Sequence, residues 1–334
     1  MIIATNGRGF WVMDDITPIR SNAKRSKQPA LLFDIAAHTR FGYNWWMNYA
    51  PGGDPGGMKK YFVQNLRPNH VFYELGVVNG EKRREFVNTG DAKSLGVTIY
   101  FELAKEPKQI TLTILDSQDN EIRHYSKEDM RLKTVDANDP SFNSGLNKFV
   151  WDMRYDAVEL IDLQPIAAPG KYKAKLTVDG VEQVSEFELF NNPNETYTQQ
   201  EIAAKTKFWM ALYEGAKLSS EKIQQAMSLQ KEVMAKAESN EAAKSEAQKV
   251  SDVVDAYKSV YIPQGRTLAE VVNQPAKIYS KFVWLHNMME QTEGPPNQPS
   301  LDQLEKLKKI MADADATYEK NIKEAMEAFD KASK

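Results

Sequence analysis

The composition of this chain changes abruptly at Asn191–Asn194, and this change constrains the fold more than any other feature of the sequence. Before it, short runs rich in β-branched and aromatic residues alternate with turn-forming residues. After it, Ala, Lys, Glu, Gln and Met dominate. Strands favour the first composition and helices the second. The 334 residues therefore predict an α+β protein of several domains, with a β half followed by a helical half.

The β half shows the two-residue alternation that is typical of half-buried strands. In the run Gly145–Tyr155, the side chains of Phe149, Trp151 and Met153 share one face. Later, Asp179–Gly180 supplies a two-residue hairpin turn, in which glycine adopts a positive φ at little cost. We expect the apolar face of the first strand to pack against three residues of this hairpin: Tyr172, Leu176 and Phe187.

The pattern divides the chain into four parts. Short antiparallel strands at this spacing are typical of an immunoglobulin-like β-sandwich, which we place at residues 92–191. Residues 28–91 contain further strand-like runs around the glycine-rich loop PGGDPGG, and we expect a β-rich extension that packs on the sandwich. Residues 1–27 hold a single strand and a basic linker, and residues 196–334 form the helical part.

The helical part predicts four helices joined by modest loops, which favours an antiparallel helical bundle. The first helix opens with a capping box at Thr198–Glu201. The others are expected over about 240–261, around Ile278–Met289, and after a cap at Ser300. Apolar positions repeat at helical spacing, and the residues expected to be buried include Ile202, Trp209, Tyr213, Ala216, Ile223, Met227, Met234 and, on the third helix, Trp284.

Composition and charge exclude several classes of function. The formal net charge of −3 gives no basis for binding nucleic acid or an anionic membrane surface. Cysteine is absent, which removes thiol catalysis and zinc–thiolate sites. The 4 histidines are scattered, and no nucleotide-binding or hydrolase motif occurs. No apolar run is long enough to cross a bilayer. We therefore expect no metal, no cofactor and no membrane span.

One aromatic cluster has a pattern that favours ligand binding. Tyr43, Trp45, Trp46 and Tyr49 lie just before the glycine-rich loop. Flat aromatic surfaces pack well against the C–H groups of sugars and against peptide side chains. The alternative is that Trp45 and Trp46 point to opposite faces of a strand, so that at least one belongs to the core. We take these four residues as the candidate ligand-binding site for a glycan or a peptide.

The run Ala4–Pro18 reads as a β-strand with a turn behind it, and no obvious partner strand follows. The two glycines in NGRGFW favour a tight turn that leads into a strand. A strand with apolar side chains and unpaired N–H and C=O groups tends to pair with another strand. We expect fraying at the extreme N-terminus or strand-mediated self-association.

Three motifs resemble a family of bacterial secreted β-propellers, the BNR-repeat, sortilin-like proteins labelled glycosyl hydrolases or sialidase-like. Ala4–Arg20 is similar to the family's last-blade strand, A-T-H-G-R-G/S-F-W-I-L-D-D-I-T-P-L-R, with Asn6 in place of histidine. Gly145–Tyr155 resembles G-L-N-R-F-V-W-D-L-R-Y, and Pro169–Gly180 resembles P-G-x-Y-x-V-x-L-T-V-D-G. In the helical region, the resemblance is limited to the general helical pattern of the sequence and includes no specific motif.

The resemblance implies that the chain is the C-terminal portion of a longer protein, because most of the propeller and a signal peptide are missing from it. It also implies a secreted or periplasmic location. The blades of such propellers carry the catalytic groups, so no catalytic residue is expected here, and the chain is expected to be a non-catalytic accessory or interaction region whose partner is the upstream propeller. Two alternatives stay open: a carbohydrate- or peptide-binding sandwich, and a fragment of a glycoside hydrolase whose site lies on the missing propeller.

Overall fold

The computed structural model of the chain describes residues 1–6, 9–13, 15–20, 29–40, 72–78, 81–86, 96–128, 140–161, 163–193, 196–238, 240–263, 274–290 and 294–333. Across these residues the protein is a mixed α+β chain whose sheets are mainly antiparallel. It divides into two compact units. We call them the β unit, Met1–Asp156 with Ile166–Thr196, and the helical unit, Ala157–Pro165 with Tyr197–Lys334.

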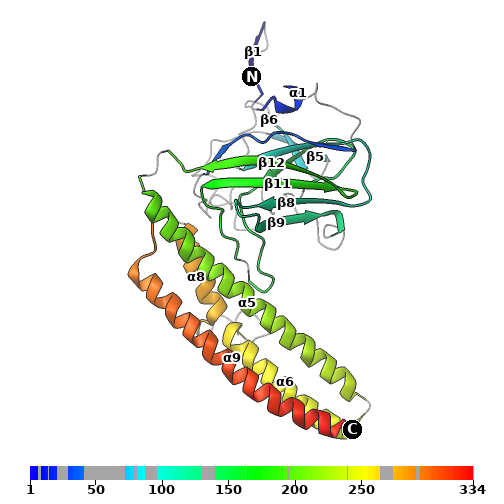
Figure 1. Cartoon of the computed structure of the whole chain (residues 1–334), viewed down its shortest axis with the longest axis vertical. Coiled ribbons are helices and arrows are strands. Elements are labelled where there is room, and N and C mark those ends of the chain that lie inside the picture. The colour runs from blue at the N-terminus through cyan, green and yellow to red at the C-terminus, as the bar shows by residue number, and fades with distance from the viewer. Residues whose placement is uncertain are drawn as a thin grey trace. The chain divides into compact units, whose positions relative to one another are not determined.

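Two sheets make up most of the β unit. One has the order β10-β7-β3, with β10 at Gly145–Trp151, β7 at Val97–Leu103 and β3 at Ala30–Leu32. The other has the order β4-β12-β11-β8-β9, and the strands β12, β11, β8 and β9 lie side by side in Figure 1. All neighbours are antiparallel except the pair β4 and β12. The strands of the second sheet are β4 His38–Thr39, β8 Ile110–Leu115, β9 Glu121–Ser126, β11 Gly170–Val178 and β12 Val181–Phe190.

Aromatic side chains from both sheets meet in one core. Trp151 is fully buried, and its ring centroid lies 5.9 Å from that of Tyr172 and 6.0 Å from that of Phe187. Phe149 packs edge-on against Tyr125 of β9, with ring centroids 4.8 Å apart. The predicted packing against the β11–β12 hairpin is confirmed for Trp151, which contacts Tyr172 and Phe187. Phe149 is buried on the same face as predicted, but its aromatic partner is Tyr125 of β9.

The turn between β11 and β12 also follows the prediction. Asp179 has a φ of 48° and Gly180 a φ of 87°, so both central residues lie in the left-handed region that a type I′ turn requires. The Asp179 carboxylate accepts hydrogen bonds from the backbone N–H groups of Lys108 and Gln109, at 3.0 and 2.9 Å. These bonds tie the hairpin to the start of β8.

Side chains of β12 bind the backbone of the segment around β3. The Gln183 amide accepts a hydrogen bond from the Leu32 N–H at 2.7 Å and donates one to the Ala30 carbonyl at 2.7 Å. The Ser185 hydroxyl accepts a hydrogen bond from the Ile35 N–H at 3.2 Å. Because β3 belongs to one sheet and β12 to the other, these bonds join the two sheets along one side.

Two further hairpins and a short helix complete the described part of the β unit. The first hairpin consists of β1, Ile2–Thr5, and β2, Gly9–Val12, and the second of β5, Phe72–Val78, and β6, Glu81–Phe86. The helix α1 spans Thr17–Arg20. The N–H of its first residue, Thr17, donates a hydrogen bond to the Asp15 carboxylate at 2.8 Å.

The helical unit contains α5 at Gln199–Ala237, α6 at Glu241–Tyr261, α8 at Ile278–Glu290 and α9 at Gln298–Ala332. In Figure 1, α6 lies beside one half of α5, and α8 lies beside the other half. The capping box predicted at Thr198 and Glu201 is present. The cap predicted at Ser300 is wrong, because Asn297 is the N-cap and its side chain accepts a hydrogen bond from the Ser300 N–H.

The residues of α5 predicted to be buried are buried in the first half of the helix, but in the second half the buried positions differ from the prediction. Ile202, Trp209, Ala216 and Ile223 are buried as expected. The prediction is wrong for Met227 and Met234, which are 39% and 41% exposed. The stripe passes instead through residues one position earlier, Ala226 and Val233, and the latter packs with α6 and the end of α9.

The helical unit also includes Ala157–Pro165, which lies between β10 and β11 in the sequence. Val158, Ile161 and Leu163 are buried there, and Glu159 accepts a hydrogen bond from Gln224 of α5. The sequence did not predict that this segment belongs to the helical unit, because it is short and its apolar residues do not repeat at helical spacing. Among the helices that the structure describes, none has both the length and the apolar character required to cross a membrane.

Candidate functional site

The aromatic cluster predicted to bind a ligand, Tyr43, Trp45, Trp46 and Tyr49, lies outside the described residues and stays a prediction. In the ranges that are described, no three His, Asp or Glu side chains are grouped so as to hold a metal ion. Three features of the described part have the chemistry of a functional site: an exposed hairpin, a cavity between α8 and α9, and a buried polar cluster between α5 and α8.

The exposed hairpin is the β1–β2 pair. Its register runs from Ile2 opposite Val12 to Thr5 opposite Gly9, and the Thr5 hydroxyl donates to the Gly9 carbonyl at 3.1 Å. The interpretation of this run as one strand without a partner is wrong, because Ile2–Thr5 pairs antiparallel with Gly9–Val12. The hairpin pairs with no other strand that the structure describes.

The side chains of this hairpin are apolar and exposed. Phe10 is 78% exposed, Ile2 70% and Trp11 59%. Neither β1 nor β2 carries a charged side chain. Both outer edges of the hairpin therefore present backbone hydrogen-bonding groups flanked by apolar side chains, which is the arrangement that binds a further strand.

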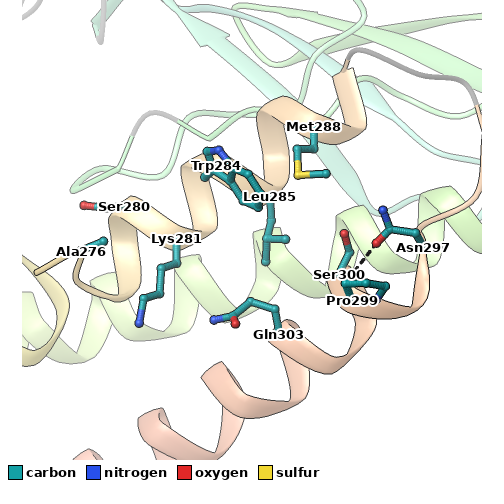
Figure 2. A pocket seen from close by; sticks show the side chains of 10 residues that line it. All are labelled: Ala276, Ser280, Lys281, Trp284, Leu285, Met288, Asn297, Pro299, Ser300 and Gln303. Atoms are coloured by element: carbon teal, nitrogen blue, oxygen red, sulfur yellow. Dashed lines mark hydrogen bonds between the residues drawn. The ribbon is translucent and has the colours of Figure 1, made fainter.

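The second feature is a cavity of about 600 Å³ in the helical unit (Figure 2). Trp284 and Met288 of α8 line one side of it, and Leu285, 1% exposed, lies at its base. Asn297 and Gln303 line it from the start of α9. The volume is within the range of small-molecule sites, and the lining is largely apolar with a few polar groups.

The assignment of Trp284 to the core is wrong, because its side chain is 63% exposed. The buried stripe of α8 runs through Ile278, Phe282, Leu285 and Met289, and position 284 lies off this stripe. The sequence holds the signal for this: a tryptophan one position before a stripe residue points about 100° away from the buried face.

The polar groups of the cavity include several hydrogen-bond donors. Within the described ranges, the Lys281 ammonium forms no ion pair, and the side-chain NH₂ groups of Asn297 and Gln303 form no hydrogen bond. The Asn297 oxygen is used in the cap, accepting from the Ser300 N–H at 2.9 Å. No Asp or Glu is found among the lining residues. The charge of the described lining is therefore positive.

The third feature is a buried polar cluster that joins α8 to α5. Trp209, 2% exposed, donates its indole N–H to Nδ1 of His286, 4% exposed. Because an indole nitrogen only donates, Nδ1 of this histidine is the acceptor, and the proton of the neutral ring lies on Nε2. Nε2 faces a carboxylate oxygen of Glu290 at 3.6 Å. Lys205, 2% exposed, lies with its ammonium 5.0 Å from the Trp209 ring centroid.

This cluster fixes the orientation of α8. Lys205 lies on the buried stripe of α5, between Ile202 and Trp209, and His286 and Glu290 lie on the buried side of α8. A charged or polar residue at a stripe position is the sequence signal for such a cluster, because lysine and glutamate are rarely buried without partners. The arrangement holds two helices in register and leaves the opposite side of α8 facing the cavity.

A second set of hydrogen-bonded polar side chains joins α6 to α9. The hydroxyls of Tyr257 and Tyr261 donate to one Asp315 oxygen, at 2.6 and 3.2 Å, and Lys222 binds the other. Burial raises the pKa of both phenols, and the neighbouring carboxylate raises them further. The phenols stay protonated donors at neutral pH, so this group is suited to structure and not to proton transfer.

Comparisons with known proteins assign no family to the chain. No family model matches it, and no curated protein matches it significantly. Among solved structures, CopC from Methylosinus trichosporium OB3b is 18% identical, with a TM-score of 0.18, covering 29% of this chain and 79% of its own. A structure titled pT26-6p is 13% identical, with a TM-score of 0.15, covering 71% of this chain and 46% of its own. At such low TM-scores, neither likeness supports a conclusion about fold or function.

Proposed function

We propose that this chain is a non-catalytic accessory and interaction region of a secreted or periplasmic BNR-type, sortilin-like β-propeller protein. In this proposal the β unit is an immunoglobulin-like sandwich, and the helical unit is an antiparallel bundle. The aromatic core shared by two sheets supports the first assignment, and the packing of α5, α6 and α9 supports the second. The three motifs that resemble the family span both sheets and the N-terminal hairpin.

The observation that carries the proposal is the β1–β2 hairpin. A two-stranded hairpin is marginally stable in water, and this one exposes apolar side chains on strands without a charge. Natural proteins protect such edges with charges, bulges or covering segments. The same residues, Ala4–Arg20, carry the resemblance to a last propeller blade. The hairpin is therefore suited to complete a blade by adding its edge to neighbouring strands.

The direct test is the genomic sequence that precedes the Met1 codon. The proposal expects in-frame blade repeats there, each with alternating strands and turn residues. A stop codon with no in-frame repeats upstream, or an unrelated domain, would overturn it.

A second test uses the longer gene product. Replacement of Phe10 and Trp11 by serine should weaken the docking of the hairpin, so that proteolysis separates the present chain from the propeller faster than in the wild type. Val181, 48% exposed on β12, offers a matched apolar control, and Val181→Ser should leave the cleavage rate unchanged. Equal cleavage rates for the wild type and the hairpin variant would argue against the proposed contact.

Glycan-array binding and hydrolysis assays distinguish the proposal from its competitors. The chain alone should bind no glycan with measurable affinity and should not release 4-methylumbelliferone from a sialoside. Specific glycan binding would favour a binding module instead, and turnover by the chain alone would place the catalytic groups within it.

A further inference from the structure

We infer that the cavity between α8 and α9 is a binding site for a monocarboxylate with an apolar body. This inference is independent of the proposed role beside a propeller, because it concerns the helical unit alone. The described lining joins an apolar surface to two neighbouring donors without a described partner, the Lys281 ammonium and the Gln303 amide. Each part specifies one half of the ligand.

The apolar half of the site is formed by Trp284, Leu285 and Met288. Leu285 lies at the base, while Trp284 presents its indole face at 63% exposure. An indole and a thioether together accept either a ring or an alkyl chain, because aromatic stacking and sulfur contacts tolerate both shapes. A ligand group that covers this exposed indole removes apolar area from water, which favours binding.

The polar half selects an anion. Lys281 and Gln303 reach toward one end of the cavity in Figure 2, and Asn297 lies at the other end, at the N-terminus of α9. Their side-chain N–H groups bind no residue that the structure describes. Because no carboxylate is found among the lining residues, a ligand carboxylate would face donors and one positive charge without repulsion from them.

The wall that carries Trp284 is held in place before any ligand arrives. On the buried side of α8, His286 accepts the indole N–H of Trp209, and its Nε2 lies 3.6 Å from Glu290. On the α9 side, Asn297 caps the helix through the Ser300 N–H. Such preorganisation lowers the entropy cost of binding. A cavity of about 600 Å³ accommodates a naphthyl group or a chain of about ten carbons.

The experiment compares two fluorescent probes that share a ring system. 1-Anilinonaphthalene-8-sulfonate carries one negative charge, and N-phenyl-1-naphthylamine carries none. The wild type should bind both probes at one site. Lys281→Gln should weaken the anionic probe about tenfold and change the neutral probe less than twofold. Trp284→Ala should weaken both probes by about fivefold or more.

Two matched controls separate this site from other apolar surfaces. Lys306→Gln removes a charge from α9 outside the cavity lining, and Trp11→Ala removes the exposed tryptophan of the hairpin. Neither should change the affinity of either probe. Circular dichroism should show unchanged helix content in every variant, because the substituted side chains are not in the core.

Displacement then tests the ligand class. Decanoate and 1-naphthoate should each displace the anionic probe, and decanol should displace it at least tenfold less well. The more effective of the two acids identifies the body as aliphatic or aromatic. The inference is overturned if Lys281→Gln weakens both probes equally, if Trp284→Ala leaves both unchanged, if Trp11→Ala abolishes binding, or if neither carboxylate displaces the probe.

Discussion

Replacing Trp151 tests whether the two sheets share one core. The side chain is fully buried and contacts Tyr172 and Phe187 of the opposite sheet, and its indole N–H donates to the Arg154 carbonyl at 3.0 Å. Tryptophan-to-alanine changes in cores cost about 3–5 kcal/mol of unfolding free energy. Because Trp151→Ala removes two aromatic contacts and one buried hydrogen bond, we expect it to lower the free energy of unfolding by about 4–5 kcal/mol, the upper end of this range.

Trp151→Phe separates these contributions. The phenyl ring keeps part of the aromatic packing but leaves the Arg154 carbonyl without its donor, so we expect a loss of about 1–2 kcal/mol. Urea unfolding followed by hydrogen–deuterium exchange of peptides from β10 and β11 reports on the β unit separately from the helices. Trp284→Ala is the matched control and should change stability by no more than about 0.5 kcal/mol, because Trp284 is 63% exposed.

Two outcomes would refute this reasoning. A loss below about 1 kcal/mol in Trp151→Ala would mean that the tryptophan does not join the sheets. A loss confined to peptides of α5–α9 would mean that the side chain acts on the other unit.

Three other predictions concern the hairpin, the helices and one loop. Deletion of residues 1–20 should leave the circular dichroism spectrum of the folded units unchanged and reduce any self-association measured by light scattering; loss of the β signal would mean that the hairpin is integral to the β unit. His286→Ala should leave the buried indole N–H of Trp209 without an acceptor and cost about 1–3 kcal/mol, measured by urea unfolding at 222 nm; an unchanged midpoint would contradict the bond. Burial alone would raise the pKa of Asp116, but hydrogen bonds from Asn120 and the Gln118 N–H lower it below its usual value. Its stabilising contribution is therefore present above about pH 4 and lost as pH falls through the folded-state pKa, so the unfolding free energy of Asp116→Asn should depend less on pH between about 4 and 2.

Local patterns predicted local structure well in this chain. The alternation around Phe149 and Trp151 set which face is buried, since a strand has only two faces. Asp179–Gly180 predicted its turn because few other residue pairs adopt two positive φ values. Thr198–Glu201 predicted a helix start because both side chains satisfy backbone N–H groups within the motif itself.

The features that the sequence did not predict depend on tertiary partners. The cap of α9 was assigned to Ser300, although Asn297 offers equivalent chemistry three residues earlier, and only the path of the chain decides between them. Lys205 is buried beside the ring of Trp209, which donates its indole N–H to His286 of α8, and a single-helix pattern contains no information on the α8 partner. The segment Ala157–Pro165 joins the helical unit through contacts with residues far along the chain.

The cavity also depends on tertiary partners. The position of Trp284 off the stripe was readable from the sequence, but the hollow beside it requires the approach of α9. The aromatic cluster Tyr43, Trp45, Trp46 and Tyr49 lies in a part of the chain outside the described residues, and ligand binding there belongs to the alternative function that the glycan array tests.

The side-chain bonds of Gln183 decide where new strands can add. A primary amide has the same donor and acceptor as a peptide group, so Gln183 occupies the free edge of β3 as one residue of a neighbouring strand would. This edge is thereby closed to templated growth into intermolecular sheets, whereas the β1–β2 hairpin has no such amide along its strands. Gln183→Val would keep β12 intact and turn β3 into a seed for aggregation, detectable as faster thioflavin T fluorescence growth than in the wild type.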